Sequence, residues 1–537
     1  MKTKPLKCTM IKNIYTLLYG GLIFACAFPS MNMFYDRWNT PKWLCTLFLT
    51  GLLAVCTAIL GHNRKKTSDF SHFSVWCETA TMIVTLECLY ALIFLFKNPT
   101  TWRIGIAGTF DNPAGLAFFL CALLPFISGM ALRFPKDNGK RNIYITVALL
   151  AGTTVVLTHS RTGILCLVAY ILMALKDYGK ISIRPTWKTI IPAIALTGFS
   201  ILFFKPESTS GRMFILEQTW ELICKRPWSG YGTGGFDREY MNQQAEFFKQ
   251  HPESPATMLA DETGHPLNEF AYLWVEHGIG APLVLLLSWA GLWHVLRKRK
   301  DISSQIGSYT LIPLLLFALF SYPFKYPLAW IAVGWCVSIA GKTYFKAFSR
   351  RKSLRALATF CLASIGIGIG TYLAHALPQE KEWGHVAREA LKGKGREMMP
   401  RYARLYPHFS HNPEFLYNYT AELFQAGQTE KAWHTAQVCR KQWSKYNLEL
   451  LTGDICRELR KYEEAVCHYR QAAYMCPVRF APLEGLYYAY RNIGDTIRTD
   501  SIAQFIQQKK VKIPSYDVER IKKEIKPKNE LMFQNDP

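Results

Sequence analysis

The sequence predicts an all-α protein, with a polytopic membrane helix bundle of about eleven spans followed by a soluble α-helical repeat domain. Three observations predict this fold class. Apolar runs of roughly 15–22 residues, the length that crosses a bilayer core, recur from about Ile11 to Ala376. Beyond residue 380 such runs stop and charged residues become dense. In that charged part, sequence patterns recur at a spacing of about 33–34 residues.

The spans follow from the apolar runs taken in order. The first run follows four lysines, but many runs come after it and no small-residue cleavage site stands out, so we expect an uncleaved helix and not a signal peptide. We expect the spans near residues 11–30, 43–61, 74–96, 113–132, 143–159, 162–175, 189–204, 267–296, 307–321, 327–341 and 356–376.

The basic residues set the expected orientation. The chain has a net charge of +24, but its Lys and Arg lie mostly in short clusters between apolar runs, so no nucleic-acid partner is expected. With a cytoplasmic N-terminus, inside segments carry about 25 Lys and Arg and short outside segments about six. An odd number of spans then puts the long loop 205–266 and the C-terminal part outside. One miscounted span would move that C-terminal part to the cytoplasm.

We therefore expect three domains, which are a membrane domain over 1–376, repeats over 377–510 and a basic tail over 511–537. Residues 415–432 superimpose on residues 448–465, and a third unit follows around Leu483 to Asp495. This spacing is typical of tetratricopeptide-like helix pairs, which stack into a surface for a peptide or protein partner. Bracing of the membrane domain is an equally good interpretation.

The 15 cysteines lie mostly singly in apolar runs, where they act as small hydrophobic residues. No Cys-x-x-Cys motif or Cys/His zinc spacing occurs, so neither a metal nor a cofactor is expected. Outside the membrane, Cys439, Cys456, Cys467 and Cys476 could form a disulfide, which the sequence does not pair.

Arg161 is the first candidate site residue. It lies between two apolar runs with almost no loop, in Ser160-Arg161-Thr162-Gly163. An arginine beside hydrocarbon is costly unless it is paired or faces a polar cavity. The alternative is interfacial anchoring, in which the guanidinium extends to the lipid head groups.

Arg212 and Arg226 are candidate anion ligands in the outside loop. Arg212 follows Gly211 and opens an amphipathic stretch, where a cation at a helix start opposes the helix dipole and favours a bound anion. An ordinary loop cation is the alternative. Arg226 precedes a glycine-rich segment that contains Gly232 and Gly234. No βαβ unit surrounds it, so it is no dinucleotide fingerprint. It is either a tight turn or a set of backbone amides facing an anion.

The outside loop closes with a polar group of side chains. His265 precedes a membrane helix, and Asn268, Glu269 and Glu276 fall with it along one helical face. A histidine or carboxylate there could act as general base for a hydroxyl nucleophile. Two guanidiniums and an imidazole at one membrane face indicate a site for a diphosphate carried on a lipid.

In these motifs the chain resembles the family of O-antigen ligases and O-antigen polymerases, which includes bacterial O-oligosaccharyltransferases. The motifs are the segment Gly105 to Pro113, the elements Ser160 to Gly163 and Gly211-Arg212, the segment Pro227 to Gly234, and Asn268 to Gly280. Each motif is weak alone, but their order and spacing together are fairly specific. The C-terminal part, which includes Lys510 to Ser515 and is called the tail below, looks like the repeat domain attached to one bacterial branch of this family.

The resemblance implies a GT-C-like fold that transfers a glycan from undecaprenyl diphosphate to a hydroxyl acceptor, such as lipid A–core, without a metal. It implies a multi-pass protein of the bacterial inner membrane with periplasmic repeats. Arg161, Arg212 and Arg226 would bind the diphosphate, with Asn268, Glu269, Gly232 and Gly234 in support. The family histidine would position or deprotonate the acceptor, and attack on the anomeric carbon would invert it.

One departure from the family pattern concerns the base. The family histidine directly precedes the asparagine, where this chain has Leu267. His265, Glu269 or Glu276 could take over that role, or the role could be dispensable because diphosphate is a good leaving group. A ligase is the first interpretation, a polymerase the second and a protein O-oligosaccharyltransferase the third. A polysaccharide transporter with a scaffolding tail is the alternative from another class.

Overall fold

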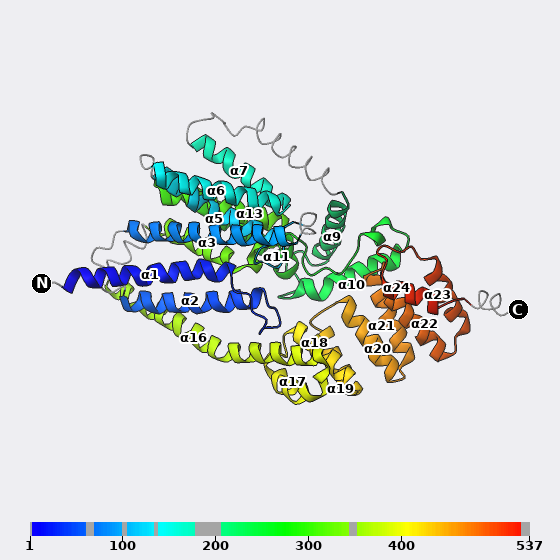
Figure 1. Cartoon of the computed structure of the whole chain (residues 1–537). Coiled ribbons are helices and arrows are strands. Elements are labelled where there is room, and N and C mark those ends of the chain that lie inside the picture. The colour runs from blue at the N-terminus through cyan, green and yellow to red at the C-terminus, as the bar shows by residue number, and fades with distance from the viewer. Residues whose placement is uncertain are drawn as a thin grey trace. The chain divides into compact units, whose positions relative to one another are not determined.

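The computed structural model describes residues 3–60, 69–98, 105–133, 138–177, 206–342 and 352–527. Every regular element in these ranges is a helix, so the expected all-α class is confirmed (Figure 1). The chain divides into two compact units, each described by itself below. The first comprises Met1–Gly198 and Val284–His385, and the second Phe199–Leu283 and Val386–Pro537. The loop expected between two spans therefore folds in one unit with the C-terminal part.

The first unit is a bundle of long apolar helices (Figure 1). Its hydrophobic core lies mainly on α5, where Leu116, Phe119, Leu123 and Phe126 are buried among α3, α6 and α13. The helices are α1 (Thr3–Ala27), α2 (Asn39–Leu60), α3 (Asp69–Lys97), α5 (Pro113–Arg133), α6 (Asn138–Leu157), α7 (Arg161–Asp177), α12 (Gly280–Arg297), α13 (Ile302–Phe320), η3 (Pro323–Lys325), α14 (Pro327–Ala340) and α16 (Lys352–Glu389).

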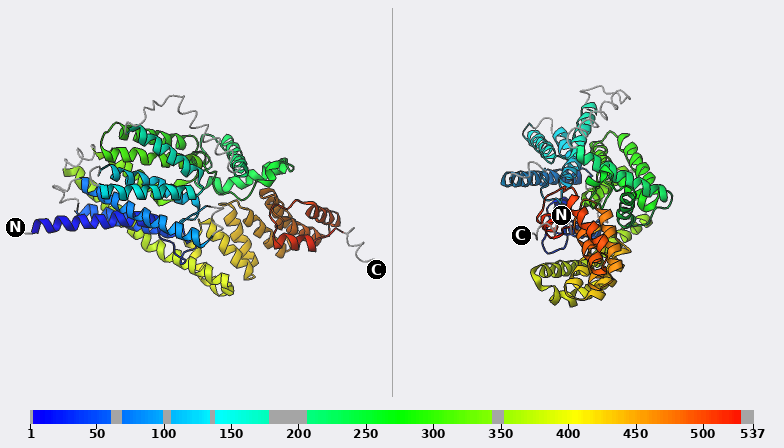
Figure 2. Two further views of the ribbon diagram at one scale, coloured as in Figure 1. Left: turned by 45° about the horizontal axis from the view of Figure 1, so that its top comes forward. Right: turned by 90° about the vertical axis from the view of Figure 1, so that its right-hand side faces the viewer.

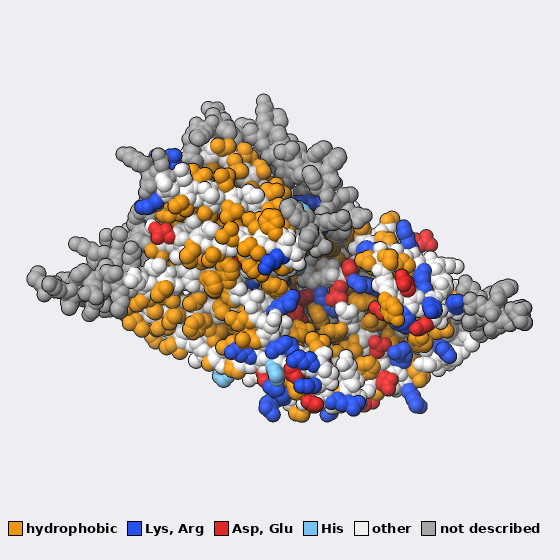
Figure 3. Space-filling view, viewed as in Figure 1, with side chains coloured by type: hydrophobic (Ala, Val, Ile, Leu, Met, Phe, Trp, Pro, Cys, Tyr) orange, Lys and Arg blue, Asp and Glu red, His pale blue; other side chains and the backbone are white. Residues whose placement is uncertain are grey.

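The outer surface of the first unit is apolar, as a membrane protein requires. Figure 3 shows hydrophobic side chains spread over these helices, and on α3 the side chains of Leu89, Ile93 and Phe96 are exposed. Six of the described helices are long and apolar enough to cross a membrane. They contain the segments Asn39–Leu60, Phe73–Lys97, Pro113–Ala131, Gly280–Arg297, Ile302–Phe320 and part of Ser353–Phe409. The expected number of eleven spans stays a prediction, and the span expected at 189–204 lies outside the described residues.

One expected span is wrong in its extent. The helix expected over 267–296 is two helices, α11 (Glu269–His277) and α12, separated by Gly278 and Ile279. Gly278 has φ 71°, and a Cβ at this position would collide with the carbonyl of Trp228. Glycine is required where φ is positive and another backbone approaches this closely. The polar first turns therefore form a separate short helix ahead of the apolar α12.

The second unit combines the loop segment, described from residue 206 to residue 283, with the C-terminal helices (Figure 2). Tyr240 and Met241 of the loop share a hydrophobic cluster with Tyr446, Met475 and Cys476. The loop contributes α9 (Pro206–Lys225), α10 (Gly235–Gln250), η2 (Pro255–Met258) and α11. The C-terminal part contributes η4 (Ala390–Lys394), α17 (Gly395–Phe409), α18 (Pro413–Gln425), α19 (Thr429–Arg440), α20 (Tyr446–Glu458), α21 (Tyr462–Met475), α22 (Ala481–Ile493), α23 (Thr496–Gln508) and α24 (Tyr516–Glu524).

Small residues let the C-terminal helices pack closely. Gly453 of α20 and Gly485 of α22 both face the ring of Tyr469 on α21, and a Cβ at Gly453 would lie 2.6 Å from that ring. The Tyr469 hydroxyl donates to Asp454 at 2.7 Å. One buried aromatic side chain thus fixes the packing of three successive helices. The four cysteines of this part are unpaired thiols, so the structure contains none of the disulfides they could form.

Candidate functional site

Arg161 is the first residue of α7, in a turn of the first unit that reverses the chain. His159 has φ 54°, which ends α6, and Ser160 caps α7 by accepting a hydrogen bond from Gly163 N at 3.2 Å. Arg161 is partly buried in this turn. A close contact of Gly163 with Ala117 packs the first turn of α7 against α5. The backbone that carries Arg161 is therefore fixed against α5.

The segment before α5 lies directly against this turn. Ile106 N donates to the carbonyl of Leu157 at 3.2 Å. Gly105 has φ 102°, and a Cβ there would collide with the Thr158 carbonyl. The Gly105–Pro113 motif and the Arg161 motif, about 50 residues apart in sequence, are thus neighbours in space.

A buried polar network, which the sequence analysis did not identify, supports this segment. The Glu87 carboxylate accepts from Thr109 N at 2.8 Å and from the Thr109 hydroxyl at 2.9 Å. Lys42 Nζ donates to the Thr109 carbonyl at 2.7 Å. Lys42 and Glu87 are almost completely buried. A signal was present in the sequence, because a charged residue within an apolar span is rare and usually functional.

A second part of the network reaches the surface of the unit. Lys325 forms an ion pair of 2.7 Å with Asp111, and the Tyr326 hydroxyl donates to the same carboxylate at 2.7 Å. Burial alone would raise the pKa of Asp111, but the hydrogen bond and charge of Lys325 lower this pKa below its usual value. Asn112 donates to the hydroxyls of Tyr322 and Tyr326. The network therefore keeps Asp111 ionised and fixes the Gly105–Pro113 motif.

In the second unit, the glycine-rich segment closes over the end of α11. Tyr231 N donates to the Val275 carbonyl and Gly232 N to the Glu276 carbonyl, both at 2.8 Å. Gly232 has φ 81°, and Gly234, with φ 73°, is the N-cap residue of α10. The amide of Gly232 therefore bonds a carbonyl group here, as in a tight turn. The exposed guanidinium of Arg226 lies 4.8 Å from the ring centre of Tyr231.

His265 lies within a compact group of residues at the start of α11. Its ring stacks on Tyr272 at 4.8 Å, and its Nε2 lies 3.7 Å from a carboxylate oxygen of Glu269. Its Nδ1 accepts a hydrogen bond from Leu267 N at 2.9 Å. The neutral ring must then carry its proton on Nε2, which faces Glu269. Asn268 caps α11 by accepting from Ala271 N at 2.9 Å, so its side chain supports the helix.

Glu276 follows on the same side of α11 and is nearly completely buried. Among the described residues its Oε1 atom has no hydrogen-bond partner, and its Oε2 atom lies 3.9 Å from His277 Nε2. Burial and the charge of Glu276 raise the pKa of the neighbouring Tyr272 above its usual value. A buried carboxylate oxygen without a hydrogen-bond partner is costly and often indicates a functional role.

Arg212 lies on α9 and is exposed. The helix begins at Pro206, so Arg212 is in its second turn and the expected conflict with the helix start is wrong. A shallow apolar groove of about 340 Å³ runs along the same helix, lined by Met213, Leu216, Trp220, Ile223 and Ala271. Arg212, Arg226, Gly232, Gly234, His265, Asn268, Glu269 and Glu276 all belong to the second unit, and Arg161 belongs to the first.

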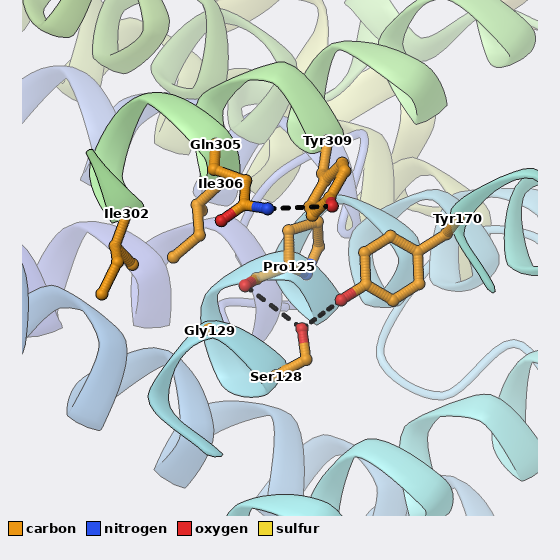
Figure 4. A pocket seen from close by; sticks show the side chains of 8 residues that line it. All are labelled: Pro125, Ser128, Gly129, Tyr170, Ile302, Gln305, Ile306 and Tyr309. Atoms are coloured by element: carbon orange, nitrogen blue, oxygen red, sulfur yellow. Dashed lines mark hydrogen bonds between the residues drawn. The ribbon is translucent and has the colours of Figure 1, made fainter. Parts of the chain in front are cut away.

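A separate cavity of about 350 Å³ lies in the first unit between α5, α7 and α13 (Figure 4). Figure 4 shows Ser128, Tyr170 and Tyr309 pointing into it. The Tyr309 hydroxyl donates to Asp177 at the last residue of α7. Arg161 is the first residue of that helix, roughly 24 Å away at 1.5 Å per residue. The cavity is therefore not part of the site at Arg161. The described residues contain no group of three or more His, Cys, Asp or Glu that could hold a metal ion.

Comparisons with known proteins address the same part of the chain. Residues 146–286 match the family model described as O-antigen ligase, which supports the O-antigen ligase family for this chain. No curated protein matches the chain. The matched range contains every candidate site residue named above, from Arg161 to Glu276, although these residues come from two units.

Proposed function

Starting from the match of residues 146–286 to the O-antigen ligase family, we propose that this protein transfers a glycan from undecaprenyl diphosphate to a hydroxyl acceptor. The reaction takes place at the outer face of the bacterial inner membrane, and lipid A–core is the first candidate acceptor. The observation that carries the proposal is that three arginines, a histidine and two glutamates, whose side chains suit this chemistry, all lie inside the matched range.

In the proposed step, the acceptor oxygen attacks the anomeric carbon and the bond from this carbon to the diphosphate oxygen breaks. The electron pair of that bond stays on the diphosphate, and the hydroxyl proton passes to a base. Arg161, Arg212 and Arg226 bind the diphosphate and stabilise its growing charge, for which a planar guanidinium that never deprotonates is suited. The anomeric carbon inverts, and no metal takes part.

The contacts of α11 favour Glu276 over His265 as the base. Nδ1 of His265 already accepts a backbone hydrogen bond, and Nε2 then carries the proton. Glu276 has a carboxylate oxygen without a partner among the described residues. His265 then orients Glu269 and the acceptor. Removal of His265 would leave transfer reduced, whereas removal of Glu276 would stop it.

The tail supports a partner-binding role in this proposal. Its helix pairs begin at Pro413, Tyr446 and Ala481, a spacing typical of tetratricopeptide-like repeats. If the repeats present a polypeptide, the acceptor is a protein and the enzyme an O-oligosaccharyltransferase. If the acceptor is a further glycan on the same carrier, the enzyme is a polymerase. A transporter with a scaffolding tail is the alternative outside this reaction class.

Deletion of the gene, read on a gel of the lipopolysaccharide ladder, tests the reaction. Loss of every band above lipid A–core, with accumulation of carrier-linked polymer, is expected for a ligase. Core carrying a single repeat would identify a polymerase. An unchanged ladder would exclude both and direct the search to glycoproteins and capsule.

Complementation with Arg161→Ala links the reaction to the site. Loss of an arginine that stabilises transition-state charge should lower transfer by about a hundred- to a thousandfold. Arg161→Lys should restore only part of it, because an ammonium cannot bond two phosphate oxygens in a plane. Arg498→Ala, at an exposed position of α23, is the matched control. Normal transfer by Arg161→Ala would exclude the proposed site.

A further inference from the structure

Lys445, at the start of α20 in the C-terminal part, is a buried cation that the proposed reaction does not use. Only 6% of its side chain is exposed. A buried ammonium is strongly disfavoured unless hydrogen bonds and an opposite charge compensate for the loss of water. The partners of Lys445 therefore indicate what this part of the tail holds in place.

Those partners are in the loop 205–266, in two segments that precede His265. Lys445 Nζ donates to the carbonyl of Thr263 at 3.0 Å and lies 3.7 Å from a carboxylate oxygen of Asp237. The preceding residue adds a second bond, from Ser444 N to the Asp237 carbonyl at 2.9 Å. Two consecutive residues of the tail thus bind the start of α10 and the segment before α11.

Both of these segments border His265. Thr263 precedes His265 by two residues along the chain. Asp237 follows Phe236, whose ring centre lies 6.5 Å from that of His265. One ammonium therefore connects the glycine-rich segment, through the start of α10, with the segment that carries His265. A shift of either segment would move the imidazole relative to Glu269 and Tyr272.

Other contacts besides this buried lysine join the tail to the loop. α10 packs beside α21 (Figure 1), and the shared hydrophobic cluster of Tyr240, Met241, Met475 and Cys476 joins the two parts. At the surface, Arg479 pairs with Asp261 at 2.8 Å, and both side chains are half exposed. Exposed pairs of this kind contribute little, and the apolar cluster supplies the adhesion.

We propose that Lys445 is a positioning residue through which the C-terminal helices hold the Thr263–His265 segment in place. In this role the tail is part of the active site's construction, in addition to any partner that it binds. The effect on catalysis rests on the proposed function, whereas the effect on the segment does not.

Hydrogen exchange of the full-length protein in detergent tests the positioning directly. In Lys445→Met the amides of residues 263–268 should exchange at least about tenfold faster, because a charge-assisted hydrogen bond to their segment is lost. Lys445→Arg, which can reach the same acceptors, should restore protection. Arg479→Met, which removes the surface ion pair between the same two parts, is the matched control and should leave these amides protected.

Transfer kinetics test the consequence at the site. Lys445→Met should lower kcat about tenfold with the KM for the lipid-linked donor unchanged, and Lys445→Arg should recover most of it. Unchanged protection of residues 263–268 in Lys445→Met would overturn the proposal. So would loss of protection throughout α20–α23, since Lys445 would then be a folding residue. If the wild-type protein shows no transfer at all, the proposed function fails and the exchange result still decides the positioning.

Discussion

At the scale of single residues, Leu267 shapes the site through its backbone. Leu267 has φ 57°, a left-handed conformation that is uncommon for a branched apolar side chain. Its amide donates the hydrogen bond that holds the His265 ring. Histidine and asparagine are enriched in this conformation, which makes the position suitable for the family residue.

We expect Leu267→His to leave transfer intact or to raise it. The new imidazole would stand where the family places its histidine, and its backbone conformation is more favourable than that of leucine. The measurement is transfer in the deletion strain and the thermal unfolding midpoint of the purified variant. Leu267→Val is the control and should lower the midpoint, because a β-branched residue is strained at positive φ. Total loss of transfer in Leu267→His would mean that the motif is misaligned.

The sequence predicted residue types at the site better than their partners. His265, Glu269 and Glu276 were expected on one face, and the structure brings His265 to Glu269 and stacks it on Tyr272. The sequence could not predict the hydrogen bond to His265 Nδ1, because this bond depends on one backbone angle at Leu267. The charges of Lys42 and Glu87 stand out in apolar runs, but their common partner Thr109 could not be predicted, since the three residues come from separate segments.

At the scale of elements, hydropathy located the helices but not their interruptions. The turn between α6 and α7 and the apolar part of α12 lie where the apolar runs predicted them. The break at Gly278 depends on the Trp228 carbonyl, which comes from a segment 50 residues away and leaves no local pattern. The sequence predicted the loop 205–266 only as an outside loop. Its packing with the tail depends on contacts between distant residues, such as the hydrogen bond of 2.6 Å from Gln244 to the Met475 carbonyl.

Among the C-terminal helices, we expect Gly485→Val to destabilise the tail by about 1–3 kcal/mol, because the added atoms would collide with the Tyr469 ring. Thermal unfolding and hydrogen exchange of α20–α22 would measure the loss. Gly211→Ala is the control, since nothing lies within 4 Å of a Cβ there and a helical alanine should stabilise by about 0.5–1 kcal/mol. Equal stability of Gly485→Val and the wild type would contradict the tight packing.

The same helices should lose stability in acid through Glu449. Burial would raise its pKa, but the hydrogen bond from His468 and the charge of Arg440 lower it below the usual 4.5. The native state therefore holds this proton less tightly than the unfolded chain does. The stabilisation is present above pH 4.5 and is lost as the pH falls through the lowered native pKa.

Thermal unfolding of the full-length protein between pH 7 and pH 3 tests whether stability falls in acid in this way. Glu449→Gln should lower the unfolding midpoint at pH 7 and flatten its fall in acid, because the titrating group is gone and Arg440 loses its partner. Glu463→Gln, at an exposed position on α21, is the control and should follow the wild type. A midpoint of Glu449→Gln that still falls as steeply as that of the wild type would show that other groups govern the acid response.

At the scale of the whole molecule, the orientation in the membrane depends on the number of spans and the positions of the basic clusters, and no single contact decides it. The all-helical membrane architecture came from run lengths alone, because a span needs a fixed number of apolar residues. The side on which the tail lies depends on whether the number of spans is odd, and the basic clusters decide only which loops stay inside. The grouping of residues 199–283 with the tail adds a constraint, since both must then lie on the same side.

We expect the tail to lie outside the cytoplasm, together with the loop that folds with it. Cys467 on α21 is an exposed native thiol that reports this directly. In a background without the exposed thiols of Cys224 and Cys361, a membrane-impermeant maleimide should label Cys467 in intact spheroplasts, and Cys467→Ser should abolish the signal. A Lys300→Cys variant, in the basic segment after α12, should react only after permeabilisation, because that segment is expected inside. Labelling of Cys467 only after permeabilisation would mean an even number of spans. The loop and the tail would then face the cytoplasm, away from the outer face where the proposed transfer takes place.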